Sequence, residues 1–170
     1  VTDCDTGAIR FIEKREQEDF LKVCRASSSI PVMNQPVEID GRYYVDGGIA
    51  CAVPLFEDIP CQCDKLVMVL TRHKGYRKNP VPEAMQKLYR RHFRSAPGLV
   101  DRLVTAPQRY NERMDRIDAL EEEGRVFVIR PRKPVTVSRI EKDVEKLTSL
   151  YHEGRRDAEF AYRDLLAFLG

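Results

Sequence analysis

A β-hairpin that ends in Asp-Gly-Gly constrains this sequence more than any other feature. The segment PVEIDGRYYVDGG, residues 36–48, places Asp40-Gly41 between two alternating, β-rich runs. Asp-Gly is a strong signal for a two-residue hairpin turn, because both positions accept a positive φ. The second strand of this hairpin ends at Asp46, where the chain turns sharply. Asp46 therefore has three interpretations: a turn former, a helix cap, or a catalytic carboxylate.

The rest of the chain alternates between predicted helices and strands. Residues 65–71 and 125–130 are short, continuous apolar runs, which predict strands covered on both faces. Strands separated by helices indicate an α/β layered domain with a partly parallel sheet. Residues 1–72 hold the hairpins, the Asp-Gly-Gly motif and the first core strand, and residues 73–170 form a mostly helical extension. The other predicted elements are a hairpin over 1–13 and helices over 15–29, 85–93, 99–104, 110–120, 140–151 and 158–168.

Local signals predict where two of these helices begin or end. Ser138 and Glu141 have the spacing of a capping box at the start of the helix over 140–151. Gly154 is expected to close that helix, and Gly124 is expected to cap the helix over 110–120 at its C-terminal end.

Composition and charge argue against several classes of function. The chain has 29 basic and 27 acidic residues, a balance that does not favour nucleic-acid binding, and no apolar run approaches the ~20 residues of a membrane span. Five cysteines without a secretory signal predict buried, reduced thiols in a cytoplasmic protein. Cys61 and Cys63 offer two metal ligands, but no second Cys or His pair stands at zinc-like spacing, so we predict no metal and no cofactor.

The surroundings of Asp46 resemble the second half of the patatin-like phospholipase family. The matching stretch is ASSSIPVMNQPVEIDGRYYVDGGIACAVPL, residues 26–55, in which a hairpin strand delivers an Asp in a D-G-G motif. The stretches VTDCDTGA, LVMVLTRHKGYRK and RYNERMDRIDALEEEGRVFVIRP also resemble a bacterial branch of that family, so the resemblance extends over nearly the whole chain. It implies a three-layer patatin-like α/β fold, of which this chain is the C-terminal portion.

The resemblance also implies serine hydrolase chemistry by a Ser-Asp dyad without histidine. Asp46 would be the general base that accepts the serine proton during attack on the carbonyl of a lipid or another ester. Gly47 and Gly48 beside it would admit the loop that carries the serine. The strand would hold Asp46 within the ~2.6–3.2 Å of the hydroxyl that proton transfer needs.

The nucleophile of such a dyad is not found in this chain. The family places it in a G-x-S-x-G motif, and none of the serines here has glycines two residues to either side; they are Ser27, Ser28, Ser29, Ser95, Ser138 and Ser149. The chain also opens at Val1 inside a predicted strand, so we expect it to be part of a longer protein. Its N-terminal half would supply the nucleophile and oxyanion loop, and this chain alone would be inactive.

The small residues over 26–29 are expected to pack closely near Asp46, at the end of a predicted helix. That helix carries Phe20, Val23, Cys24 and Ser27 on one face.

Other features leave alternatives open. The basic segments 72–78 and 90–94 fit either a solvated surface or peripheral contact with anionic lipid headgroups. Tyr89 and Phe93 fall on an apolar helical stripe, which favours core packing. Arg109-Tyr110-Asn111 resembles a family element without an assigned chemistry. The competing function is a non-catalytic α/β binding module, in which Asp-Gly-Gly is only a turn.

Overall fold

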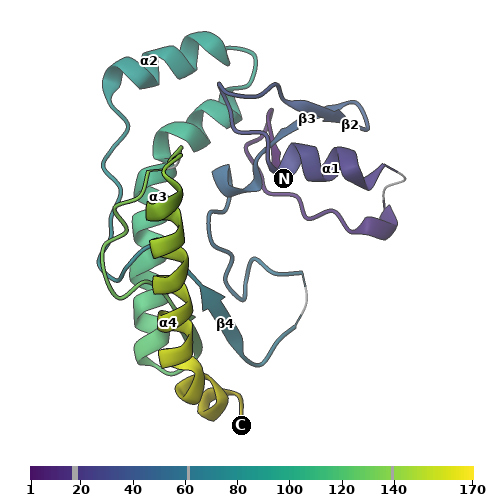
Figure 1. The fold of residues 1–170 in the computed structure, drawn as a ribbon. Helices are drawn as coiled ribbons and strands as arrows, with labels where there is room; N and C mark the ends of the chain where they lie inside the picture. The colour runs from purple at the N-terminus through teal and green to yellow at the C-terminus, as the bar shows by residue number, and fades with distance from the viewer. Residues whose placement is uncertain (17–18, 61, 139) are drawn as a thin grey trace. The chain divides into compact units, whose positions relative to one another are not determined.

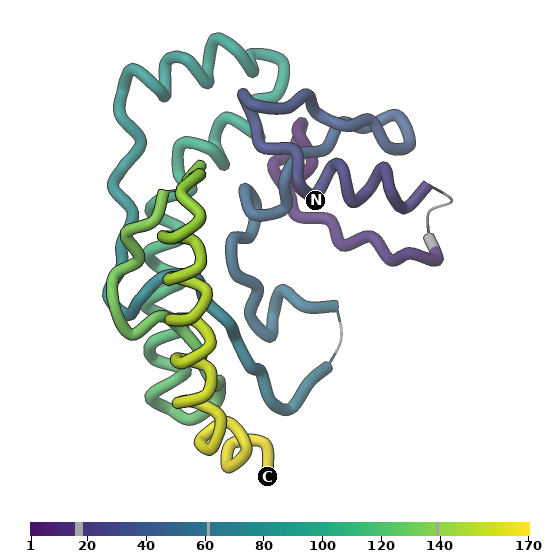
Figure 2. The backbone as a smooth tube through the Cα atoms, viewed as in Figure 1, coloured from purple at the N-terminus to yellow at the C-terminus, as the bar shows by residue number. Residues whose placement is uncertain are grey.

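The computed structural model describes residues 1–16, 19–60, 62–138 and 140–170 (Figure 1). These residues form a mixed α/β fold that divides into two compact units. The first unit contains residues 1–60 and 78–113, and the second contains residues 61–77 and 114–170. Figure 2 traces the backbone through both units from the N-terminus to the C-terminus.

A three-stranded antiparallel sheet forms the centre of the first unit, in the order β1-β3-β2. Its strands are β1 (Thr2–Asp3), β2 (Val37–Ile39) and β3 (Arg42–Val45). Asp40 and Gly41 join β2 to β3 with φ angles of 52° and 74°. Positive φ at both positions is what a tight two-residue hairpin turn requires, so the predicted hairpin is confirmed.

The N-terminal hairpin is shorter than predicted. Thr2 and Ile9 form a single antiparallel bridge, and the amide of Arg10 donates to the carbonyl of Val1 at 2.8 Å. Residues 10–13 form no strand. Instead, β1 pairs with β3, which places it directly beside the strand that leads to Asp46.

Helix α1 (Phe20–Ser27) packs against this sheet and is shorter than the predicted helix over 15–29. Asp19 begins it, because its carboxylate accepts a hydrogen bond from the amide of Lys22 at 3.1 Å. Residues 17–18 of the predicted helix lie outside the described residues.

The buried stripe of α1 also differs from the predicted one. Val23 and Ala26 are buried, followed by Ser29, whereas Cys24 and Ser27 are exposed. The short helix presents positions three residues apart to the sheet, so only that narrow stripe is covered. Preceding α1 is a turn of 3-10 helix, η1 (Lys14–Glu16). The buried cluster between α1 and the sheet consists of Val23, Ala26, Val37, Ile39 and Tyr44.

A second core of the first unit lies near the junction of α2 (Glu83–His92) and α3 (Pro97–Glu122). The sequence predicts two helices over 99–104 and 110–120, but α3 is a single helix with Pro107 inside it. A proline removes one backbone hydrogen bond, and the packing of an apolar face can outweigh that loss. The buried residues of this core are Cys4, Val45, Phe93, Ala96, Leu99, Val100 and Leu103.

In the second unit, β4 (Leu66–Val69) and β5 (Val126–Ile129) pair as a two-stranded parallel sheet. Both predicted strands are therefore confirmed. The prediction that both faces are covered is wrong, because Val67 and Val69 of β4 are 37% and 73% exposed. A two-stranded sheet keeps one face open unless another layer packs on it.

Helix α4 (Val144–Leu169) replaces the two predicted C-terminal helices. Its cap is Asp143, whose carboxylate accepts the amides of the second and third helical residues at 3.0 and 3.3 Å. The predicted capping box of Ser138 and Glu141 is wrong, since the helix begins after it. Gly154 lies within α4 and does not close a helix.

Three further observations concern the packing, the ends and the polarity of the two long helices, α3 and α4. The rings of Phe127 in β5 and Phe168 in α4 lie 5.7 Å apart. Gly124, with a φ of 69°, follows the end of α3 as predicted. Although α3 and α4 have 26 residues each, neither they nor any other helix in the described residues is apolar enough to cross a membrane.

Candidate functional site

Asp46 lies between β3 and the short 3-10 helix η2 (Gly47–Ile49), in the first unit. Its amide donates to the carbonyl of Ser29 at 3.0 Å, and its Oδ1 accepts the amide of Gly48 at 2.7 Å. Its Oδ2 accepts no hydrogen bond from any residue that the structure describes. The carboxylate thus caps η2 through one oxygen, and the other oxygen can accept a further donor.

Thr2 fixes both ends of this turn. Its hydroxyl donates to the backbone carbonyl of Asp46 at 2.7 Å and accepts the amide of Ala50 at 3.1 Å. The side chain is completely buried, and an unpaired polar group in such a place is costly. The pairing of β1 with β3 brings Thr2 to this position.

Arg109 of α3 binds the same turn from another side. Its guanidinium donates to the carbonyls of Ile49 and Ala50, both at 2.7 Å, and to that of Arg102 at 3.1 Å. Its Nε donates to the hydroxyl of Thr105 at 3.2 Å. Burial, together with the charge of Arg102, lowers the pKa of Arg109. A planar, multidentate donor suits this position, so Arg109 holds the chain just after Asp-Gly-Gly.

The two residues after Arg109 bind a different segment of the same unit. Asn111 exchanges two hydrogen bonds with the backbone of Lys78, at 2.8 and 3.0 Å. The ammonium of Lys78 lies 4.1 Å from the ring centroid of Tyr110. Arg109-Tyr110-Asn111 therefore has a structural role that the sequence did not reveal, because its partners are distant along the chain.

Gly47 and Gly48 allow two close approaches at the motif. A Cβ at Gly47 would lie 3.2 Å from the backbone nitrogen of Val1, and a Cβ at Gly48 would lie 3.0 Å from Oδ1 of Asp46. Gly48 thus gives room to the capping carboxylate, and Gly47 gives room to the backbone of Val1, which precedes β1.

The serines near Asp46 contribute backbone contacts. The hydroxyls of Ser28 and Ser29 donate to carbonyls of α1, those of Cys24 and Arg25, at 2.7 and 2.8 Å. Ser29 is buried, and its carbonyl accepts the Asp46 amide. The predicted close packing near Asp46 is confirmed for Ser29.

An apolar groove of about 330 Å³ opens beside Gly47. The side chains of Ile9 and Phe11 on its wall are 36% and 43% exposed, so two large apolar groups stand open to solvent at this groove. The groove is lined by Val1, Ile9, Arg10, Phe11, Ile12, Phe20, Val23, Cys24, Ser27, Gly47, Cys51 and Pro54.

The described cysteines are free and differ in exposure. Cys4 is buried as predicted, and burial raises the pKa of its thiol to about 11. Cys24 and Cys63 are exposed, contrary to prediction: Cys24 lies on the uncovered face of α1, and Cys63 lies in a segment without helix or strand. Cys61 lies outside the described residues. Among the residues that the structure describes, no three His, Cys, Asp or Glu side chains are grouped as a metal site.

Two family models match parts of this chain. Residues 2–59 match Patatin-like phospholipase, which confirms the resemblance around Asp46 over a narrower range than the sequence suggests. Residues 96–170 match a second model, described as Domain of unknown function (DUF6363). No curated protein and no solved structure gives a significant match.

Proposed function

Because residues 2–59 match the patatin-like phospholipase family, we propose that this segment supplies the general base of a serine lipid acyl hydrolase. Asp46 is that base. The observation that carries the proposal is the difference between the two carboxylate oxygens. Oδ1 accepts a hydrogen bond from the amide of Gly48, while Oδ2 accepts none from the described residues. A base fixed in this way is oriented before the substrate arrives.

The reaction class is hydrolysis of a lipid ester or another carboxylic ester. Asp46 accepts the proton of a serine hydroxyl as its oxygen attacks the ester carbonyl, and the alcohol leaves with a proton. Water then attacks the acyl-serine, and the carboxylic acid is released as the serine regains its proton. No cofactor takes part in these steps.

The serine and the oxyanion loop come from a segment outside this chain, the N-terminal half of the same protein. The apolar groove beside Gly47 supports this part of the proposal, because exposed Ile9 and Phe11 are suited to burial under another segment. The complete protein has the three-layer patatin-like fold, and the open face of β4 is suited to a further layer. The 170-residue chain alone is inactive, since it lacks the groups that attack the ester and stabilise the oxyanion.

The proposal places the enzyme in the cytoplasm of a bacterium. The free cysteines among the described residues support a reducing compartment, and the bacterial assignment rests on the resemblance of residues 1–8, 66–78 and 109–131.

A fluorophosphonate probe and an Asp46→Asn variant test the proposal. The longer protein that contains the upstream segment should label at one serine and hydrolyse p-nitrophenyl esters, and the 170-residue chain should do neither. In the longer protein, Asp46→Asn should abolish turnover without changing the unfolding transition, because Asn still accepts the Gly48 amide. Asp64→Asn, on an exposed segment, is the matched control. Labelling of a serine within the 170 residues would refute the proposal, as would near-normal turnover by Asp46→Asn.

The capping bond from Gly48 to Asp46 also favours a second candidate, a non-catalytic α/β binding module. In such a module Asp46 serves only the turn. This candidate predicts that the residues encoded before Val1 lack G-x-S-x-G and that the longer protein does not react with the probe.

A further inference from the structure

The two basic segments of this chain, residues 72–78 and 90–94, differ in whether their cations form ion pairs. In segment 72–78, Lys74 lies 3.4 Å from Glu121, and Arg77 binds Asp115 and Asp118. These cations therefore have acidic partners inside the second unit. In segment 90–94, the three arginines have no ion-pair partner among the described residues; they are Arg90, Arg91 and Arg94.

The unpaired arginines surround the end of α2, a helix in which no residue is buried. Lys87 adds a fourth exposed cation one turn earlier. Acidic residues are few here: Glu83 stands at the opposite end of α2, and Asp101 lies on α3. The basic face of α2, defined as Lys87, Arg90, Arg91 and Arg94, therefore carries a clear positive excess although the whole chain has a net charge of only +2.

Apolar surface accompanies these charges. Met85 and Leu88 of α2 are 40% and 43% exposed. Tyr89 and Phe93 pack against the core as predicted, so they anchor α2 and are not the exposed apolar groups.

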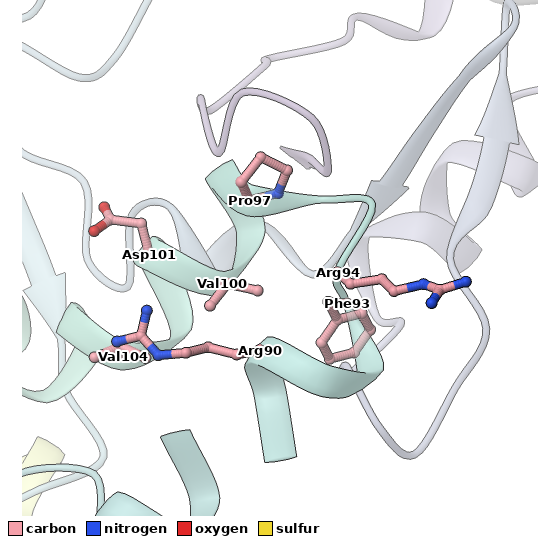
Figure 3. Close-up of a pocket in the computed structure, with 7 residues that line it drawn as sticks. All are labelled: Arg90, Phe93, Arg94, Pro97, Val100, Asp101 and Val104. Atoms are coloured by element: carbon pink, nitrogen blue, oxygen red, sulfur yellow. The ribbon is translucent and has the colours of Figure 1, made fainter. Parts of the chain in front are cut away.

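A pocket of about 230 Å³ adjoins the basic face, with an apolar floor that includes Phe93 and Val100. Figure 3 shows Arg90 and Arg94 extending in opposite directions from the end of α2. The pocket is lined by Arg90, Phe93, Arg94, Pro97, Val100, Asp101 and Val104.

We propose that the basic face of α2, with Met85 and Leu88, binds the surface of an anionic membrane. Guanidinium groups pair with lipid phosphates, and the exposed apolar side chains enter the boundary between headgroups and acyl chains. Several cations spread around the end of α2, with Arg90 and Arg94 extending in opposite directions, match an extended anionic surface better than a single small phosphate. The adjacent apolar groups distinguish this face from one built for nucleic acid, where charge dominates.

This inference extends the proposed function, since a lipid hydrolase must reach substrate in a bilayer, and it relies on that function only for the choice of partner. Cosedimentation of the 170-residue chain with phosphatidylcholine vesicles, with and without phosphatidylserine, tests it without turnover. The chain should bind the anionic vesicles and dissociate as salt is added. Each cation near such a surface contributes about fivefold in affinity, so Arg90→Gln/Arg94→Gln should weaken binding by about 25-fold.

The matched control is Lys22→Gln/Arg25→Gln, which removes two exposed cations from α1 in the same unit. It should change vesicle affinity less than twofold. Met85→Gln/Leu88→Gln should weaken binding while leaving its salt dependence unchanged, because only the apolar contribution is lost. Circular dichroism of each variant should match that of the original chain.

Equal binding to vesicles with and without phosphatidylserine would overturn the inference, as would equal losses in the two charge variants. Displacement by inorganic phosphate at constant ionic strength would assign the face to a soluble anion. Binding of duplex DNA with the same sensitivity to Arg90 and Arg94 would assign it to nucleic acid, and either result would also overturn the inference. The Asp46→Asn variant of the 170-residue chain should bind vesicles as the original chain does. A failure of vesicle binding can therefore be told apart from a failure of the hydrolase proposal.

Discussion

The hydroxyl oxygen of Thr2 lies 2.7 Å from the backbone carbonyl oxygen of Asp46 and accepts the amide of Ala50 at 3.1 Å. One buried side chain from the first strand therefore connects the residue before η2 to the residue after it. The position of Asp46 depends on β1 as well as on the hairpin that ends at it.

Replacing Thr2 by Val tests this connection. Val has nearly the same shape but neither donates nor accepts a hydrogen bond, so the Asp46 carbonyl and the Ala50 amide lose their partner. We expect the free energy of unfolding to fall by about 2 kcal/mol. Urea denaturation measures the change. Thr148→Val, on the exposed face of α4, should cost less than about 0.5 kcal/mol, and similar losses in the two variants would contradict the role of Thr2.

Arg109→Lys tests the second support of the motif. An ammonium cannot reproduce the planar fork that reaches the carbonyls of Ile49 and Ala50 together, so we expect a loss of about 1–2 kcal/mol in unfolding free energy. In the longer protein, kcat should fall more than KM changes, because Arg109 acts through the position of Asp46. Arg116→Lys, exposed on the same helix, is the control, and equal kinetics for both variants would remove Arg109 from this role.

Asp3 makes the stability of the first unit depend on pH in a defined direction. Burial opposes its ionisation, but hydrogen bonds from Thr6 and Asp5 and the charge of Arg42 outweigh burial and lower the pKa of Asp3. A carboxyl with a lowered pKa in the folded state stabilises the fold above its unfolded pKa, and this contribution disappears as pH falls through the folded pKa.

The difference in unfolding free energy between the original chain and Asp3→Asn should therefore narrow as pH falls below about 4. Urea denaturation at a series of pH values measures it. Arg42→Gln should remove the part of this dependence that arises from the ion pair. A difference that stays constant down to about pH 2 would show that Asp3 is not stabilised as an anion.

Adjacent residues determine the parts of this fold that the sequence predicts well. Asp40-Gly41 specifies its turn through the positive φ of both residues, and this turn fixes the register that places Asp46 at the end of β3. The continuous apolar runs of β4 and β5 likewise predict strands. The capping role of Asp46, one of its three interpretations, follows from the same local pattern.

Contacts between distant residues determine what the sequence did not reveal. Arg109 is separated from Ala50 and Ile49 by 59 and 60 residues, so no local pattern connects them. The sequence draws attention to Arg109-Tyr110-Asn111 but contains no sign of their partners. Helix ends are also misjudged where a helix breaker is tolerated, as at Pro107 and Gly154.

Two glycines inside helices should respond oppositely to substitution by alanine. Gly98 of α3 faces the turn at residues 5–7, and a Cβ there would lie 2.4 Å from the carbonyl oxygen of Asp5. Backbone atoms on both sides cannot move aside cheaply, so Gly98→Ala should destabilise the first unit by about 1–3 kcal/mol. Around Gly154 of α4, no atom lies within 4 Å of the added Cβ. Gly154→Ala should stabilise α4 by about 1 kcal/mol, because alanine has the higher helix propensity.

Thermal unfolding of both variants measures these opposite effects, with circular dichroism following the helices. Both variants replace a glycine inside a helix by alanine. Opposite effects on the melting temperature would therefore be caused by the close approach of residues 5–7 to α3. If Gly98→Ala raised the melting temperature as Gly154→Ala does, the tight packing of this turn on α3 would be wrong. The path of β1 to its place beside Asp46 would then lack its support, since Gly7 at φ 69° meets the same helix at Gly98.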